Sequence, residues 1–372
     1  MSDAYIAGYG TALPFRISQE RFLEVDAEAR TLHGQGEGTK AMVRQFAQNS
    51  GIRFRHSTQP CWLPDGERPA GLEDIFRDNA FDPPGWLRAR SWQRTAPPLA
   101  LRAARAALAS WGGSPSDITH VVTTCTSGWS EPGIATELIH GLGLSLDCRK
   151  QELNFNGCFC GMTCLRLARD IVRAGEAKAV LVVAVETAST QYDCVVTDVS
   201  HLVATVLFSD GAAAFVVAPE GEWMLELAGM SLVPDTRAML RMAPDTAAPR
   251  ETYRMFLDRN VGNRLAEFFR NERGRELVDA MLERSGGTPP ALAVHPGGPN
   301  ILEAVAGAFQ ERGFPADALE VSNRALHDTG NLGAAAMLYV LTQALPRVRG
   351  ERVEALAFGP GVTVEWGALR RV

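Results

Sequence analysis

The sequence predicts an α/β fold made of two similar halves, on three observations. Short apolar runs, partly β-branched, are typical of buried strands in a sheet covered by helices. Stretches of helical periodicity lie between these runs, and such alternation favours the α/β class. A stretch at 4–14 (AYIAGYGTALP) has a faint echo at 225–235 (LELAGMSLVPD), which favours a first half over 1–220 and a second half over 221–372.

The elements of the first half are predicted from residue composition and from the glycines and prolines at their ends. A strand is expected at 4–10, and the segment 56–98, with repeated prolines and three tryptophans, should be a long irregular excursion with short helical turns. Pro97 and Pro98 then open an alanine-rich helix that ends at Gly112-Gly113. Next come a strand at 119–128, a helix at 159–173, and strands at 179–187 and 211–218.

The second half continues the alternation. Helical patterns cover 262–285, 299–313 and 331–345, and Pro346 stops the last of them. Short apolar strands are expected at 290–298 and 353–361.

Composition excludes several classes of function. A net charge of −6 and a pI near 5.7 give no basic surface for nucleic acid. No window reaches the roughly 18 apolar residues of a membrane span, and the first residues do not resemble a secretory signal, so we expect a cytoplasmic protein. The cysteine count of seven is odd, and a chain of this length does not depend on disulfides, so free thiols are expected.

A glycine-punctuated turn, NFNGCFCGMTCLRLARDIV (154–172), brings three cysteines together before an amphipathic helix. Cys158 falls at or next to the helix N-terminus, where the macrodipole lowers the pKa of a thiol and favours a nucleophile. Cys160 is rotated away on the first turn, and Cys164 lies deeper in the helix. Buried free cysteines that only pack remain one alternative. A metal site is a weaker one, because no second pair at ligand spacing exists, and we expect no metal.

Two further polar turns offer partners for a nucleophile. His295 follows an apolar strand, and Asn331 stands at a helix start after Gly330. Either residue alone is more often structural, as a core histidine or a helix cap. Three strand-to-helix turns bearing Cys, His and Asn can converge at one edge of a helix-covered sheet, where such folds bind ligands.

Five ordered motifs between about 95 and 370 resemble those of type III polyketide synthases, the chalcone synthase family of the thiolase superfamily. The motifs are GCFCGMTCLRLARD, LFSDGAAA, VHPGGPNILEAV, GNLGAAAML and FGPGVTVE. The resemblance implies a duplicated αβαβα thiolase-like fold, with two five-stranded mixed sheets and helices between and outside them. It also implies a homodimer.

The resemblance assigns roles to particular residues. It implies that Cys158 is the nucleophile, that His295 and Asn331 complete the catalytic triad, and that Phe208 is a gatekeeper. The substrate pocket would include Thr126, Ser127, Met255, Gly333, and the loop Gly359, Pro360 and Gly361.

The implied reaction joins an acyl-CoA starter with malonyl-CoA by repeated decarboxylative condensation, followed by cyclisation. Coenzyme A thioesters are substrates, and no metal or redox cofactor is implied. A ketoacyl synthase III-like enzyme that performs one condensation is the alternative, and a non-catalytic acyl-CoA-binding scaffold is an alternative of another class.

Several positions depart from the family pattern. Glu131 stands where a methionine crossing the dimer interface is common, Met255 replaces a second gatekeeping phenylalanine, and Gly333 replaces a frequent serine. A roomier cavity would favour an aliphatic acyl or malonyl starter. The CoA phosphates should be held by cations near the N-terminus, and the candidates, out of clean register with the family, are Lys40, Arg44, Arg53 and Arg55. A solvated helix face is the alternative for these charges.

Overall fold

The computed structural model describes residues 3–244 and 253–372. One large mixed sheet runs through it, in the order β11-β12-β13-β8-β1-β7-β6-β4-β5. The strands are β1 (Tyr5–Ala12), β4 (Ile118–Thr124), β5 (Arg149–Glu152), β6 (Ala179–Glu186), β7 (Gly211–Ala218), β8 (Trp223–Leu232), β11 (Ala291–Val294), β12 (Arg352–Gly359) and β13 (Thr363–Arg371).

The expectation of two five-stranded sheets is therefore wrong in one respect, because the described strands of both halves join in a single nine-stranded sheet. Five strands precede residue 220 and four follow it, and β1 and β8 join the two sets through only two residue pairs, Tyr5 with Met224 and Ile6 with Trp223. The two strands whose sequences echo each other are thus neighbours at the centre of the sheet. The boundary between halves at 220 remains a prediction.

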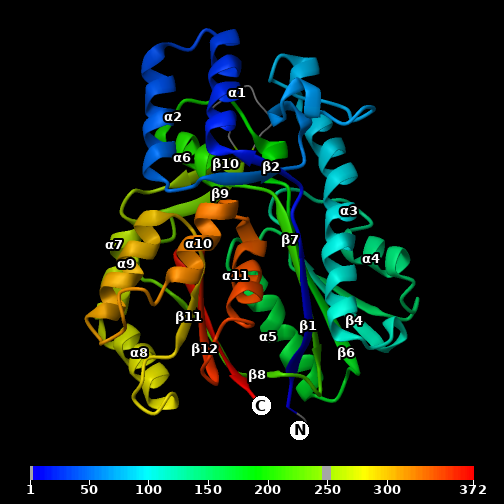
Figure 1. Cartoon of the computed structure of the whole chain (residues 1–372), viewed down its shortest axis with the longest axis vertical. Helices are drawn as coiled ribbons and strands as arrows, with labels where there is room; N and C mark the ends of the chain where they lie inside the picture. The colour runs from blue at the N-terminus through cyan, green and yellow to red at the C-terminus, as the bar shows by residue number, and fades with distance from the viewer. Residues whose placement is uncertain (1–2, 245–252) are drawn as a thin grey trace.

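Helices cover the sheet in layers (Figure 1). The helices are α1 (Gln19–Leu32), α2 (Glu37–Asn49), α3 (Gly85–Trp111), α4 (Ile134–Leu142), α5 (Cys160–Arg173), α6 (Val199–Leu207), α7 (Val261–Arg270), α8 (Glu272–Arg284), α9 (Pro299–Gln310), α10 (Glu320–Thr329) and α11 (Ala336–Ala344). None of the helices within 3–244 and 253–372 is long and apolar enough to cross a lipid bilayer.

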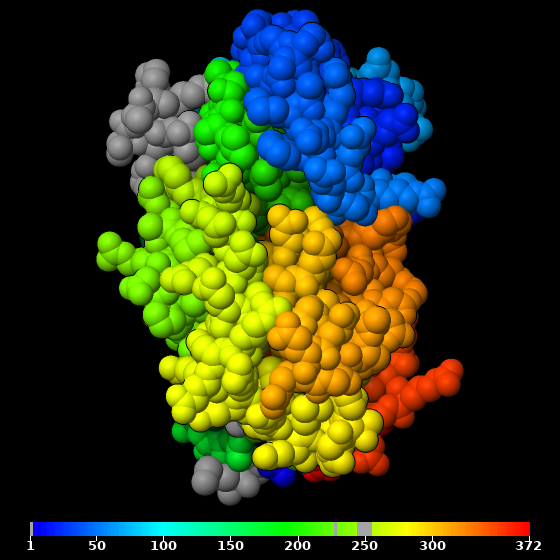
Figure 2. Space-filling model, turned by 90° about the vertical axis from the view of Figure 1, so that its left-hand side faces the viewer, coloured from blue at the N-terminus to red at the C-terminus, as the bar shows by residue number. Residues whose placement is uncertain are grey.

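Three apolar cores explain the layers. The core between α5, α11 and the strands on either side includes Leu165, Ala168 and Val172, so the amphipathic helix predicted at 159–173 buries its apolar face there. A second core lies between α3, α4 and the opposite face of β4, β6 and β7. A third places α7 and α9 against β11 and β12 and extends to α1 and α6. The strands before and after residue 220 thus form two layers of the one sheet, and the order across the molecule is helix, sheet, helix, sheet and helix, as expected. Figure 2 shows the outer helices of the second half beneath the N-terminal helices.

Helix α3 begins twelve residues before the expected start at Pro97, so 85–98 is helical and the irregular excursion with short helical turns is limited to 58–84. Both prolines lie inside the helix, where each removes a backbone hydrogen bond. The apolar stripe continues through them, because Trp92, Ala96 and Leu99 are all buried. Burial of this face against the sheet outweighs the local cost of the prolines.

Other elements match their expected positions with small changes. The helical pattern over 262–285 is divided at Asn271, whose side chain accepts a hydrogen bond from the Gly274 amide and caps α8. The pattern over 331–345 opens with a 3₁₀ turn, Gly333–Ala335, before α11. Two small two-stranded sheets, β2 (Phe15–Ser18) with β3 (Phe54–Ser57) and β9 (Leu240–Pro244) with β10 (Tyr253–Leu257), lie above the layers near α1, α2 and α6 (Figure 1).

Candidate active site

Cys158 lies in the turn between β5 and α5, two residues before the helix starts at Cys160. It is partly exposed, whereas Cys160 and Cys164 are completely buried. The turn depends on Gly157, whose φ of 103° disfavours any residue with a side chain. A Cβ there would come within 2.2 Å of the Pro360 ring. Of the three cysteines in the motif, Cys158 is the one accessible to a substrate.

The electrostatics of Cys158 differ from the expectation. We expected the helix N-terminus to lower the pKa of the thiol, but burial, followed by the nearby Glu186 carboxylate, raises that pKa to about 12. The N-cap position belongs to Phe159, so Cys158 stands outside the first helical turn. The thiol is therefore neutral at neutral pH in the unliganded protein.

Cys160 and Cys164 form a buried pair on α5. A hydrogen bond from Cys164 lowers the pKa of the Cys160 thiol, while burial raises that of Cys164. The Cys160 Sγ also lies 3.4 Å from the Leu153 carbonyl oxygen. Within the described part of the chain, no three His, Cys, Asp or Glu side chains are grouped as metal ligands would be. The pair packs the helix against the sheet.

His295 follows β11 directly and is 2% exposed. Its backbone N–H donates to the Leu356 carbonyl of β12 at 2.8 Å, which extends the parallel pairing and fixes the residue. Burial lowers the pKa of the imidazole to about 4. The buried Nδ1 has no hydrogen-bond partner. The ring is thus neutral at pH 7, with one nitrogen that lacks a partner.

Asn331 lies between two helices, α10 and the 3₁₀ turn before α11, and not in the strand-to-helix turn that we expected. It pairs with Phe208 as an isolated parallel bridge, and its Oδ1 accepts from the Gly333 amide at 2.9 Å. Its Nδ2 is 3.4 Å from the Gly297 carbonyl oxygen. A Cβ on Gly297 would lie 3.4 Å from Nε2 of His295, so this glycine links the two side chains.

A cavity of about 140 Å³ is lined by Phe208 and Gly333, the two contact partners of Asn331, whereas Cys158, His295 and Asn331 themselves are not among its lining residues. The first turn of α5 touches the Asn331 loop, because a Cβ on Gly161 would approach the Ala334 carbonyl oxygen to 2.6 Å. Five of the residues expected to contact substrate line the cavity, namely Phe208, Thr126, Ser127, Met255 and Gly333.

The loop Gly359, Pro360 and Gly361 lies elsewhere. It packs behind the Cys158 turn, where a Cβ on Gly359 would come within 3.2 Å of the Cys158 amide nitrogen. Pro360 instead borders a separate depression with Asn156 and Phe159. The loop packs against the Cys158 turn and is not part of the cavity lining.

Glu186, which the sequence analysis missed, ends β6 and lines the same cavity. Its carboxylate accepts from the Thr126 hydroxyl at 2.6 Å, from the Thr126 amide at 3.0 Å and from the Ser127 amide at 2.9 Å. Burial raises its pKa in spite of these donors. A single acidic residue at the end of an otherwise apolar buried strand is the signal that could have identified it.

The four expected CoA cations do not form one patch. Lys40 and Arg44, both on α2, pair with Glu37 at 2.5 and 3.6 Å. Arg53 is exposed, and its guanidinium lies over the Phe54 ring. Arg55 points inward and lines the cavity. The structure therefore groups Lys40 with Arg44 and separates Arg53 and Arg55 from them.

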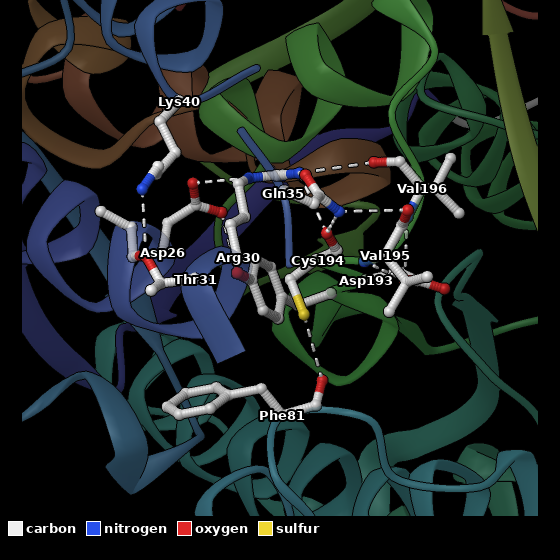
Figure 3. A network of polar contacts seen from close by, with 12 residues as sticks. Asp26, Arg30, Thr31, Gln35, Lys40, Phe81, Asp193, Cys194, Val195 and Val196 are labelled. Carbon is white, nitrogen blue, oxygen red and sulfur yellow. Dashed lines mark hydrogen bonds and ion pairs between the residues drawn. The ribbon is translucent and has the colours of Figure 1, made fainter. Parts of the chain in front are cut away.

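A network of polar contacts joins α1 to the loop that follows β6 (Figure 3). Arg30 pairs with Asp26 at 2.8 Å and donates to the Cys194 carbonyl oxygen at 3.0 Å, while Gln35 binds the carbonyl of Val195. The hydroxyl of Tyr192, a cavity residue, donates to Asp26 at 2.8 Å. Helix α1 thereby fixes the loop that follows β6.

Models of the chalcone and stilbene synthases match two parts of the chain. The N-terminal domain model matches residues 87–221 and the C-terminal domain model residues 291–372. A bisdemethoxycurcumin synthase of Oryza sativa subsp. japonica is 33% identical over 394 residues, covering 97% of this chain and 91% of that protein. The type III polyketide synthase B of Arabidopsis thaliana is 32% identical over 284 residues, covering 72% of this chain and 71% of that protein.

Solved structures agree in fold. The C-terminal type III polyketide synthase domain of Steely1, a type I/III hybrid from Dictyostelium, has a TM-score of 0.84, with coverage of 100% of this chain and 99% of that chain. The polyketide synthase PKS-I of the brown alga Ectocarpus siliculosus has a TM-score of 0.88 with the same coverage. Both are 23% identical to the chain, so they establish the thiolase-like fold alone.

Proposed function

The chain belongs to the chalcone and stilbene synthase family, the type III polyketide synthases, which are acyl-condensing transferases, and on that premise we propose that Cys158, His295 and Asn331 are its catalytic residues. The observation that supports the proposal is a chain of contacts around one cavity. Asn331 accepts from the amide of Gly333, a cavity residue, and its Nδ2 is 3.4 Å from the Gly297 carbonyl beside His295. Glu186, which also lines the cavity, acts electrostatically on Cys158.

Loading would begin with Cys158 and His295. Both are neutral before substrate binds, since burial raises the pKa of one and lowers that of the other. The thiol would attack the carbonyl carbon of an acyl-CoA thioester as its proton passes to the imidazole. The imidazolium would then protonate the departing CoA thiolate, and the acyl group stays on Cys158. The nitrogen of His295 that lacks a partner supports this role as base.

Decarboxylation would use Asn331 together with the His295 ring. The Asn331 Oδ1 is occupied by the Gly333 amide, so the side chain presents its NH₂ group as a donor. One of these N–H groups and the imidazole would hold the thioester oxygen of malonyl-CoA while CO₂ leaves, and so stabilise the enolate. The enolate carbon would attack the thioester on Cys158, which returns a chain longer by two carbons to CoA.

Repeated extension would precede cyclisation to a pyrone, a resorcinol or phloroglucinol, or a naphthol. We propose an aliphatic acyl or malonyl starter, because Met255 and Gly333 both line the cavity where bulkier or polar residues are common in the family. We further propose that acyl-CoA and malonyl-CoA are used without a metal or redox cofactor. The CoA-binding cations and the cytoplasmic location remain predictions.

We also propose that the protein is a homodimer. Two apolar side chains, Met230 and Leu232, are 46% and 63% exposed, and both border the depression next to Pro360. Large exposed apolar side chains grouped in this way favour a protein interface.

Mass spectrometry tests the catalytic proposal. The protein is incubated with malonyl-CoA and a panel of acyl-CoAs, and both the products and the intact protein are weighed, for the wild type, Cys158→Ala and the control Cys160→Ala. We expect cyclised polyketides and a covalent acyl adduct from the wild type and from Cys160→Ala, and neither from Cys158→Ala. A product of one condensation would favour the ketoacyl synthase III-like alternative, and CoA binding without turnover would favour the scaffold. An adduct on Cys160 would contradict the assigned nucleophile.

A further inference from the structure

Arg55 brings a guanidinium to the wall of the cavity. It lies on β3, its Nη2 donates to the Phe208 carbonyl oxygen, and its guanidinium carbon is 3.9 Å from the centroid of the Phe22 ring. A carbonyl and an aromatic face orient the cation without neutralising it. The side chain is thus held in place and still charged.

The guanidinium lacks a counterion in contact. No carboxylate among the described residues lies within ion-pair distance, and the buried Nη1 has no hydrogen-bond partner. Asp26 is paired with Arg30, and Asp210 already accepts hydrogen bonds from Thr58 and Ser189. Burial lowers the pKa of Arg55 to about 10, so the group remains charged at neutral pH.

A buried cation without a contacting anion is unusual, because desolvation of a charge is costly unless it is paired. The guanidinium has five N–H donors, and a carboxylate can accept two of them in parallel. An anionic oxygen of a bound substrate would therefore supply the hydrogen-bond acceptor that Nη1 of Arg55 lacks within the protein. Met242 and Met255 line the same cavity as Arg55, and methionine side chains adapt readily to the shape of a bound group.

The contacts of Arg55 connect it to one of the proposed catalytic residues. Arg55 bonds to the carbonyl of Phe208, and Phe208 is the residue that pairs with Asn331. One residue, Phe208, thus separates the guanidinium from Asn331, a member of the proposed triad. Glu186, the other charged group on the cavity wall, already accepts hydrogen bonds from Thr126 and Ser127. It also accepts from the Ala334 amide, so it lies beside the loop that carries Asn331.

We propose that Arg55 is a specificity-determining residue that binds the terminal carboxylate of a short dicarboxylic acyl group loaded on Cys158. The inference rests on the proposed function, since it takes Cys158 as the loading site. It deepens that function by naming a substrate class, the half-thioesters of dicarboxylic acids. The aliphatic body of such an acyl group would lie along Phe208 and Met255, with its carboxylate against Arg55.

The test compares matched starters. Succinyl-CoA and butanoyl-CoA have acyl chains of the same length and differ in the terminal carboxylate. We expect the wild type to load succinyl-CoA with the higher kcat/KM. Arg55→Met should lower the value for succinyl-CoA at least about tenfold, as loss of a charge-assisted hydrogen bond does, and change that for butanoyl-CoA less than about threefold. The control, Arg16→Met, removes an exposed guanidinium from the adjacent strand and should change neither.

Other outcomes overturn the proposal. An equal fall for both starters in Arg55→Met would mean that Arg55 only supports the fold, and an unchanged ratio would mean that it does not sense the carboxylate. If Arg55→Met does not fold, Arg55→Lys replaces it, because it keeps the charge and should keep the preference for succinyl-CoA. Loss of that preference in a folded Arg55→Lys protein contradicts the proposal. A wild type that does not prefer succinyl-CoA also contradicts it. The intact mass of the protein distinguishes failure of the proposed function from failure of this inference. Absence of any adduct on the wild type refutes the proposed function, whereas butanoyl loading with no preference for succinyl refutes the inference alone.

Discussion

Burial holds both His295 and Cys158 in their neutral forms, and this has consequences for the pH dependence of single residues. A histidine whose folded pKa is depressed stabilises the protein above its unfolded pKa of about 6.5. That contribution is lost as pH falls towards the folded value of about 4. Between these limits the unfolded chain binds a proton that the folded chain does not.

We expect His295→Gln to reduce the acid sensitivity of folding. Urea unfolding of the wild type and the variant at pH 7 and pH 4.5 gives the change in the free energy of unfolding for each. The wild type should lose more, by on the order of 2 to 3 kcal/mol over this interval. Because both proteins share all other titrating groups, the difference between them isolates the imidazole. Equal losses would contradict burial of a neutral His295.

The charge of Glu186 should be measurable at Cys158. Its carboxylate is the second cause, after burial, of the raised pKa of the thiol. Glu186→Gln removes the charge, so the thiol pKa should fall and alkylation of Cys158 by iodoacetamide at pH 8 to 9 should become faster. Glu226→Gln, which removes a carboxylate paired with Arg352 and Arg370, serves as control and should leave the rate unchanged. A slower reaction in Glu186→Gln would contradict the electrostatic assignment.

At the scale of elements, the turn before α5 and the turn after β12 form one unit. Gly157 leaves no room for a Cβ against Pro360. Gly157→Ala should therefore destabilise the protein by about 1 to 3 kcal/mol, through both the clash and the positive φ. It should also reduce acylation of Cys158.

A double-mutant cycle separates the two causes. Pro360→Gly added to Gly157→Ala should recover part of the lost stability, because it removes the clash and leaves the backbone strain. The measurement is the free energy of unfolding of the wild type, both single variants and the double variant. Strictly additive effects would show that the two turns do not interact.

The elements also show what could be predicted from sequence. Strands β6 and β7 were located to within one residue because their apolar runs end in clear polar turns. The start of α3 was wrong, since Pro97 and Pro98 were interpreted as a helix start. The packing that overrides them comes from the buried stripe including Trp92 and Leu99, which depends on strands distant in sequence.

The same distinction holds for the site. The sequence was enough to select Cys158, His295 and Asn331, because each lies in a short glycine-rich motif that can be recognised without the fold. Glu186 and the inward direction of Arg55 could not be predicted in this way, because their environment is formed by segments far away in the chain. Thr126 reaches Glu186 from 60 positions away, and Phe208 is 153 positions from Arg55.

For the whole molecule, the main prediction concerns assembly. Sedimentation should give twice the chain mass of 40.2 kDa for the wild type. Leu232→Glu places a charge in the exposed apolar patch and should shift the mass towards that of one chain, by at least tenfold in dissociation constant. Leu146→Glu changes an even more exposed leucine near α4 and should leave the dimer intact. A monomeric wild type would refute the dimer.

The distance along the chain between Gly157 and Pro360 also has a consequence for biosynthesis. Roughly two hundred residues separate the turn that carries Cys158 from the proline that packs against it. At about 5 to 20 residues per second, translation of that interval takes about 10 to 40 s. During this time Pro360 cannot pack against the turn that carries Cys158, so the thiol of the ribosome-bound chain can be oxidised or trapped by electrophiles before the protein can catalyse anything.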